Sequence, residues 1–246
     1  RQRFATASDL YFSKNYKEAL PHLEFVVGNG PYLEPGERAL AVFRRGFVYS
    51  QRGEPGDLER AVADYTAVID MTDAPPEPRA KAFVNRGVTY RRRGEPGDAG
   101  RAVADYTAVI DMGDAPPEPR ARARANRGMV YARRGEPGDV GQAVADYTAV
   151  IDMGDAPPEQ LAQAHFNRGM VYARRDEPGD VGRAVADYTA VIDMGDAPPE
   201  LRAIAQRLRD RLVANQELPK PDPLNDAGNH GTNTTTEPGA APAPDA

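Results

Sequence analysis

A repeat of 41 residues is the feature that most limits what this chain can fold into. The string AVADYTAVIDM occurs four times at this spacing, with its Asp first at Asp64 and last at Asp187, and a Glu-Pro-Gly-Asp string precedes each copy. Residues 94–134 and 135–175 differ at only seven positions. A long, constant period is the signature of an array in which each unit packs on its neighbours, so we expect a repeat protein.

Within each unit, apolar and small residues recur at helical spacing in two segments, such as 80–90 and 102–110. The Glu-Pro-Gly-Asp string between the two segments is typical of a tight turn. We predict that its last residue, Asp98 in one unit, caps the second helix. No alternating strand pattern of useful length occurs, so the predicted fold class is all-α.

The order of these residues resembles the tetratricopeptide repeat (TPR). Gly87 and Tyr90, followed by Ala102, Tyr106 and Val109, match that family's pattern of small and aromatic residues on two antiparallel helices. The pattern recurs in the other units at Gly46/Tyr49/Ala61/Tyr65, Gly128/Tyr131/Ala143/Tyr147 and Gly169/Tyr172/Ala184/Tyr188. The N-terminal segment looks like a divergent copy, carried by Ala7, Leu10, Ala19, Leu23 and Pro31.

This resemblance implies an α-α superhelix, a right-handed solenoid of about five helix hairpins plus a C-terminal capping helix. The usual TPR unit has about 34 residues, and the extra residues here fall in the turn and in the connector, where added length costs little. The likeness covers residues 1–217. The expected units are 1–33, 34–74, 75–115, 116–156 and 157–197, with a cap at 198–217.

The C-terminal end differs from the repeats. Leu201, Ile204, Leu208 and Leu212 are predicted to share one face of the cap, and Asp210 stands where the repeated Gly would recur. Nothing further should therefore stack on that face. Residues 218–246 contain six Pro and few apolar residues, and we expect a disordered tail.

Two columns of the repeat predict contacts inside the array. Gly128 and its equivalents recur in the middle of a helix, where Gly costs up to about 1 kcal/mol relative to Ala, so close approach of another helix is expected. Arg127 of the repeated Asn-Arg-Gly adjoins this position. We predict that it pairs with Asp105 or Asp146 on a flanking second helix, as an orienting contact.

The composition argues against several functions. The chain has no Cys and three scattered His, which removes thiol chemistry, disulfides and a clustered His or Cys metal site. Its mean hydropathy is −0.62, and no apolar run is long enough to cross a bilayer. We predict a non-enzymatic protein without cofactor, metal or membrane segment. The expected location is cytoplasmic, with any targeting sequence before Arg1 left open.

Eight of the eleven Tyr fall in two columns, at 49/90/131/172 and 65/106/147/188. Tyrosines beside arginines raise the alternative of base stacking in an RNA-binding protein. Both columns lie on the packing stripes, however, and the net charge of −6 is unfavourable for binding phosphates. We interpret these tyrosines as core residues, and nucleic acid is disfavoured as a partner.

The charges separate between the two helices of a unit. Residues 77–93 carry six cations and one acid, whereas residues 95–114 carry one Arg and five acids. In TPR arrays the first helices line the concave face, so the resemblance implies a basic groove. The alternative is that basic and acidic helices attract one another across the stack.

The predicted groove takes the residues three before, one after and five after each repeated Gly. Its members are Val84, Val88, Arg92, Ala125, Met129, Arg133, Phe166, Met170 and Arg174. An apolar strip with a row of Arg along one margin suits a segment that has apolar anchors and carboxylates.

The sequence therefore predicts a protein-protein interaction scaffold that binds a peptide or partner segment. The alternative is a structural or regulatory arm of a larger multidomain signalling protein, acting by self-association or by restraining an upstream domain. The oligomeric state is left open.

Overall fold

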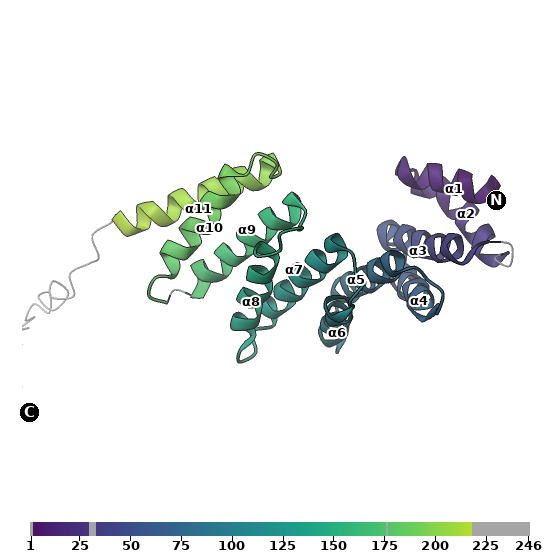
Figure 1. Ribbon diagram of the computed structural model, residues 1–246, viewed down its shortest axis with the longest axis horizontal. Helices are drawn as coiled ribbons and strands as arrows, with labels where there is room; N and C mark the ends of the chain where they lie inside the picture. The colour runs from purple at the N-terminus through teal and green to yellow at the C-terminus, as the bar shows by residue number, and fades with distance from the viewer. Residues whose placement is uncertain (1, 30–32, 176, 218–246) are drawn as a thin grey trace, which may run out of the picture.

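The computed structural model describes residues 2–29, 33–175 and 177–217, and this part of the chain forms eleven α-helices (Figure 1). They are α1 (Gln2–Phe12), α2 (Tyr16–Gly28), α3 (Pro35–Arg52), α4 (Asp57–Asp70), α5 (Pro76–Arg93), α6 (Asp98–Asp111), α7 (Pro117–Arg134), α8 (Asp139–Ile151), α9 (Pro158–Arg175), α10 (Asp180–Asp193) and α11 (Pro199–Glu217). No strand occurs within these ranges, so the predicted all-α class is confirmed. Pro31 and the predicted tail, 218–246, lie outside the described residues.

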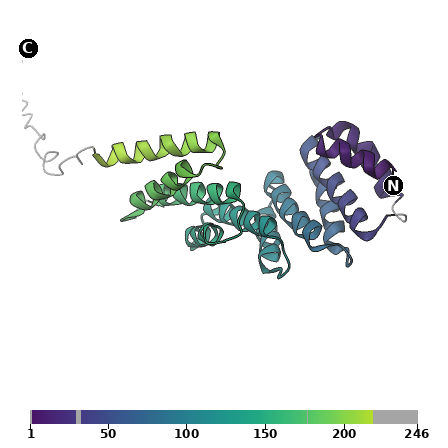
Figure 2. The same cartoon turned by 45° about the horizontal axis from the view of Figure 1, so that its top comes forward.

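The helices follow one another in an open, curved row with α1 and α11 at opposite ends (Figures 1 and 2). Each helix packs on the next, and the first helices of successive hairpins, α3, α5, α7 and α9, also contact one another directly. The row ends with α11, which packs on α10 and α9. This is a helical solenoid, as expected from the repeat.

The ends of the helices follow from Pro and Gly at fixed places. Pro76 lies at the start of α5, where its missing N–H would be unpaired in any case, and Gly94 ends α5 in the left-handed region at φ 71°. The N-cap of α6 is Gly97, at φ 85°. The predicted capping role of Asp98 is therefore wrong, because Asp98 is already the first residue of the helix and its carboxylate folds back onto the turn.

In the four hairpins from α3–α4 to α9–α10, the two helices approach closely at the repeated Gly. A Cβ atom added to Gly87 would lie 2.7 Å from Cε1 of Tyr106, closer than real side chains approach. Tyr106 is fully buried, as are its equivalents Tyr65, Tyr147 and Tyr188, which are at most 1% exposed. The interpretation of this Tyr column as core is confirmed, and these four rings present no face to a nucleic acid base.

The capping helix differs in one respect from the prediction. Leu201, Leu208 and Leu212 pack against the last core cluster, but Ile204 is 37% exposed and the fully buried residue beside it is Ala205. The side chain of Asp210 is exposed, and it bonds Gln206 and Arg209 on its own helix.

The close approach predicts that Gly87→Ala destabilises the array by about 1–3 kcal/mol, because the added methyl group overpacks the contact with Tyr106. Gly100→Ala is the matched control, since Gly100 lies in α6 with nothing within 4 Å of its Cβ position. That change should be neutral or stabilise by up to about 1 kcal/mol. Urea unfolding of both variants checks the prediction, and equal stabilities would contradict it.

Candidate functional site

One column of arginines joins the two helices of four hairpins, from α3–α4 to α9–α10. Arg127 on α7 donates from Nε and Nη2 to the two carboxylate oxygens of Asp146 on α8, at 2.9 and 2.7 Å. Its Nη1 donates to Thr107 Oγ1 on α6 of the preceding hairpin at 2.9 Å. The same carboxylate pairing recurs at Arg45–Asp64, Arg86–Asp105 and Arg168–Asp187. The predicted pairing of Arg127 is confirmed, and its partner is Asp146, not Asp105.

The carboxylates of this column lie in different electrostatic surroundings. Burial raises the pKa of Asp64 and of Asp105 above the usual range, although the paired guanidinium opposes the rise. At Asp187 burial acts in the same direction, but hydrogen bonds from His165 and Arg168 outweigh it and hold the pKa of that carboxyl below its usual range. All three carboxylates accept a bidentate guanidinium, so the geometry is that of an orienting contact.

A second column of arginines closes the turn between the helices of the same four hairpins. Arg93 donates from Nε and Nη2 to both oxygens of Asp98 at 2.9 and 2.7 Å, and the Glu95 N–H donates to Asp98 Oδ2 at 3.1 Å. The Arg93 guanidinium also lies over the ring of Tyr90, 5.3 Å from its centroid. We call this arrangement the turn clasp. Its four ion pairs are Arg52–Asp57, Arg93–Asp98, Arg134–Asp139 and Arg175–Asp180.

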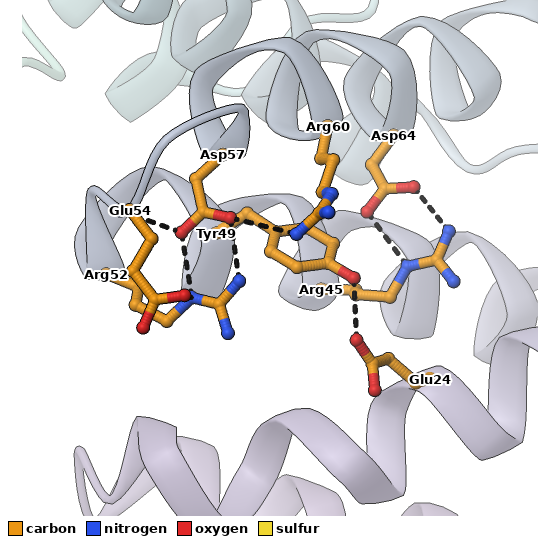
Figure 3. A network of polar contacts seen from close by, with 8 residues as sticks. All are labelled: Glu24, Arg45, Tyr49, Arg52, Glu54, Asp57, Arg60 and Asp64. Carbon is orange, nitrogen blue, oxygen red and sulfur yellow. Dashed lines mark hydrogen bonds and ion pairs between the residues drawn. The ribbon is translucent and has the colours of Figure 1, made fainter.

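Figure 3 shows the first turn clasp, in which Arg52 and Arg60 both donate to the Asp57 carboxylate. Tyr49 lies beside it, and its hydroxyl donates to Glu24 on α2 at 2.8 Å. The hydrogen bond from the guanidinium is the main cause of a lowered carboxyl pKa. It lowers the pKa of Asp98 to about 2, with Arg93 as the donor, and likewise lowers the pKa of Asp180 to about 2.

The third column, Arg92, Arg133 and Arg174, differs from the other two. All three side chains are exposed, and no carboxylate of the described residues lies in ion-pair contact with any of them. Arg92 Nη1 donates only to the backbone carbonyl of Ser50 at the end of α3. These are the arginines of the predicted groove, and they remain available to a ligand.

The apolar members of the predicted groove are less accessible. Val88, Met129, Phe166 and Met170 are half-buried on α5, α7 and α9. Val84 is 1% exposed and Ala125 is 5% exposed, so both belong to the core. The prediction of Val84 as a ligand-contacting residue is corrected on this ground, since its side chain packs within the cluster that contains Tyr106.

Two features of the first helices, one polar and one aromatic, are not predicted from the sequence. Asn126, from the repeated Asn-Arg-Gly, accepts a hydrogen bond from Arg91 Nη1 at 3.0 Å, and the equivalent Asn167 has a buried Nδ2 without a partner. The other feature is a hollow of about 900 Å³ between α1, α3, α5 and α7, here named the N-terminal hollow. The repeated Asn could have been found from its period, whereas the hollow involves the divergent first hairpin.

The described residues contain no group of three metal-ligating side chains. No helix among them is both long enough and apolar enough to cross a membrane.

Comparison with solved structures gives the fold a family context. A thermophilic TPR protein of Thermus thermophilus superposes with a TM-score of 0.57 at 17% identity, over 84% of this chain and 96% of that one. The chain has a TPR fold. A tetratricopeptide repeat protein from Parabacteroides merdae superposes with a TM-score of 0.50 at 14% identity, over 95% of each chain.

No family model and no curated protein sequence matches the chain. At the identities given above, the likeness to the two TPR structures concerns the fold alone. The function of the Arg–Asp pairs and of the turn clasps therefore follows only from the geometry of this chain.

The turn clasps predict a loss of stability in acid. Because the pKa of Asp98 and of Asp180 is about 2 in the folded chain and 3.8 ordinarily, the clasps contribute fully above about pH 4 and lose that contribution toward pH 2. The double variant Asp98→Asn, Asp180→Asn should be less stable than the wild type at pH 7. Its stability should also fall less than that of the wild type between pH 4 and pH 2. Urea midpoints measure both effects. The exposed control Asp111→Asn should keep the wild-type profile, and an unchanged acid slope in the double variant would be evidence against the clasp.

The pairing of Arg127 predicts a second result. Arg127→Ala and Asp146→Ala should each cost about 3 kcal/mol, because each leaves a partly buried charge without its partner. The double variant should cost less than the sum, with a coupling energy of about 1–3 kcal/mol. The matched control is the cycle of Arg127 with Asp105, for which we expect coupling near zero. Unfolding free energies from urea denaturation decide between the two partners.

Proposed function

We propose that this chain is a non-enzymatic interaction scaffold that binds an acidic peptide or partner segment along α5, α7 and α9. The observation that carries the proposal is the third arginine column. Arg92, Arg133 and Arg174 recur at the same place on three successive first helices, exposed and without a carboxylate partner in the described chain.

The contrast between columns supports this function. The arginines that adjoin the repeated Gly and those of the turn clasps are saturated by Asp, so they can contribute little to a ligand. A guanidinium presents a planar, bidentate donor set that matches a carboxylate. A row of unpaired guanidinium groups therefore favours a segment with several acidic side chains.

The apolar surroundings fit the same kind of ligand. Val88, Met129 and Met170 are half-buried one turn before these arginines, so part of each side chain remains open. Methionine adapts its shape to different apolar partners. A segment that carries both apolar and acidic side chains would use both features.

The test is a charge reversal of the third column. The variant Arg92→Glu, Arg133→Glu, Arg174→Glu should lose at least about tenfold in partner affinity. Its unfolding midpoint should change little, because these arginines make no ion pair in the free protein and only Arg92 makes a hydrogen bond, to the Ser50 carbonyl. Partners captured from the source cell with the wild type are identified and then titrated against each purified variant. Wild-type affinity should fall as salt rises from about 50 mM to 500 mM.

The matched control is Arg38→Glu, Arg207→Glu, Arg211→Glu, which makes the same change of net charge at exposed sites on α3 and α11. This control should bind as the wild type does. Retained affinity in the first triple variant would move the binding surface away from the column. Self-association would be favoured instead if the mass of the free wild-type chain in sedimentation rises with concentration and the Arg92, Arg133, Arg174 triple Glu variant loses this rise.

A further inference from the structure

The N-terminal hollow, at about 900 Å³, is lined by residues of α1, α3, α5 and α7. Of these helices, α1 and α3 lie at the purple and blue end of the array in Figure 1. One wall is aromatic. The Tyr11 ring contacts Phe12 and Phe47 edge-on, with centroid distances of 5.6 and 5.5 Å. Phe12 is 70% exposed, more than any other large apolar side chain of the described residues. The wall therefore offers apolar surface that nothing in the described array covers.

Arg44 lines the same hollow and is the unusual group in it. Its side chain is only 8% exposed, and no carboxylate of the described residues pairs with it. It donates to the Ser8 hydroxyl, and its guanidinium lies 5.0 Å from the Phe12 ring centroid and 5.4 Å from that of Tyr11. A buried charge is costly unless it is paired, and aromatic faces and one hydroxyl compensate this cost only in part.

The electrostatics of Arg44 agree with this description. Burial lowers the pKa of its guanidinium from the ordinary value, and no carboxylate opposes the change. In the repeats that follow, the equivalent position is Asn85, Asn126 or Asn167, which carries no charge. The uncompensated cation is therefore specific to the hairpin that forms the hollow.

The rim of the hollow carries two cations and two acids. Lys81 Nζ lies 2.6 Å from a Glu77 carboxylate oxygen, and Arg122 Nη1 lies 3.4 Å from one of Glu118. Each pair joins residues one turn apart on its own helix, Lys81 and Glu77 on α5, and Arg122 and Glu118 on α7. The two pairs leave the rim close to neutral. A doubly charged phosphate would meet both rim carboxylates, whereas a single carboxylate can reach Arg44 with less repulsion.

We propose that the N-terminal hollow is an anchor site for a partner peptide that carries a bulky apolar side chain beside an Asp or Glu. The apolar side chain packs on Phe12 and Phe47, and the carboxylate pairs with Arg44. The proposal rests on the function proposed above, because it adds a second anchor for the same kind of partner segment. Both anchors lie on the first helices of the array. The proposal assigns the second anchor to α1 and α3, outside the three helices that carry the third arginine column.

The test uses random twelve-residue peptides displayed on phage, selected in parallel on the full wild-type chain, on Arg44→Met and on the Arg92, Arg133, Arg174 triple Glu variant. Peptides enriched on the wild type are synthesised with blocked ends. They are titrated against the reporter variant Phe12→Trp, whose indole is the only one in a chain that otherwise lacks Trp. Phe25→Trp is the matched reporter, since Phe25 is 46% exposed and does not line the hollow.

We expect a class of enriched peptides with Asp or Glu within two residues of Phe, Tyr or Leu. These peptides should change the indole fluorescence of the Phe12→Trp variant and leave that of the Phe25→Trp variant unchanged. Arg44→Met should weaken them at least about tenfold, as should replacement of the peptide's acid by its amide, because a charge-assisted hydrogen bond is lost. Phe12→Ser should weaken them without unfolding the chain, since this side chain is mostly exposed.

Stability separates a binding role of Arg44 from a structural one. Removal of an uncompensated buried charge should keep or raise the melting temperature of the free chain, whereas a structural role predicts a lower one. Peptides that bind Arg44→Met as tightly as the wild type, or the absence of any enriched acidic and apolar class, would overturn the anchor site. Binding that is lost in Arg44→Met but retained in the triple Glu variant supports the anchor in the hollow and opposes the role of the arginine column. Binding that is retained in Arg44→Met but lost in the triple Glu variant supports the arginine column and opposes the anchor in the hollow.

Discussion

The contact between a glycine on the first helix and a tyrosine ring on the second fixes the geometry of the four hairpins from α3–α4 to α9–α10. At Gly87 the ring of Tyr106 occupies the space that any side chain would need. The chain neighbours of these two residues, Arg86 and Asp105, then face one another across the same interface and form a bidentate pair. The ion pair is thus a consequence of the helix approach, and a change that separates the helices would weaken both.

This geometry divides the arginines of the first helices by function. Attraction between basic and acidic helices accounts for two of the three columns, because Asp146 holds Arg127 and Asp98 holds Arg93. The net basic character of the first helices therefore overstates the charge that a ligand would meet. Among the arginines without a carboxylate partner in the described residues, Arg92, Arg133 and Arg174 form an exposed column that recurs in three units, and Arg44 is buried at the N-terminal end.

Most of the fold could be predicted from the period, since the repeat defines which positions are equivalent and the Gly and Tyr columns define the buried faces. The partner of Arg127 could not, because Asp105 and Asp146 are equivalent by one period and only the hairpin geometry selects Asp146. Val84 was misplaced because the first helices pack against the next hairpin as well as their own, which widens the buried face. The N-terminal hollow lies where the sequence leaves the period, so no column indicated it.

Near-identical units create a problem of register for any ligand that lies along them. Adjacent first helices contact directly, so their axes are about 8–10 Å apart, which is about three residues of an extended segment. A segment that met only Arg92, Arg133 and Arg174 could shift by one unit and meet nearly the same surface. The hairpin with Arg44 breaks this equivalence, because the following units have Asn there. An anchor at the N-terminal hollow would therefore fix the register that the repeated columns alone leave degenerate.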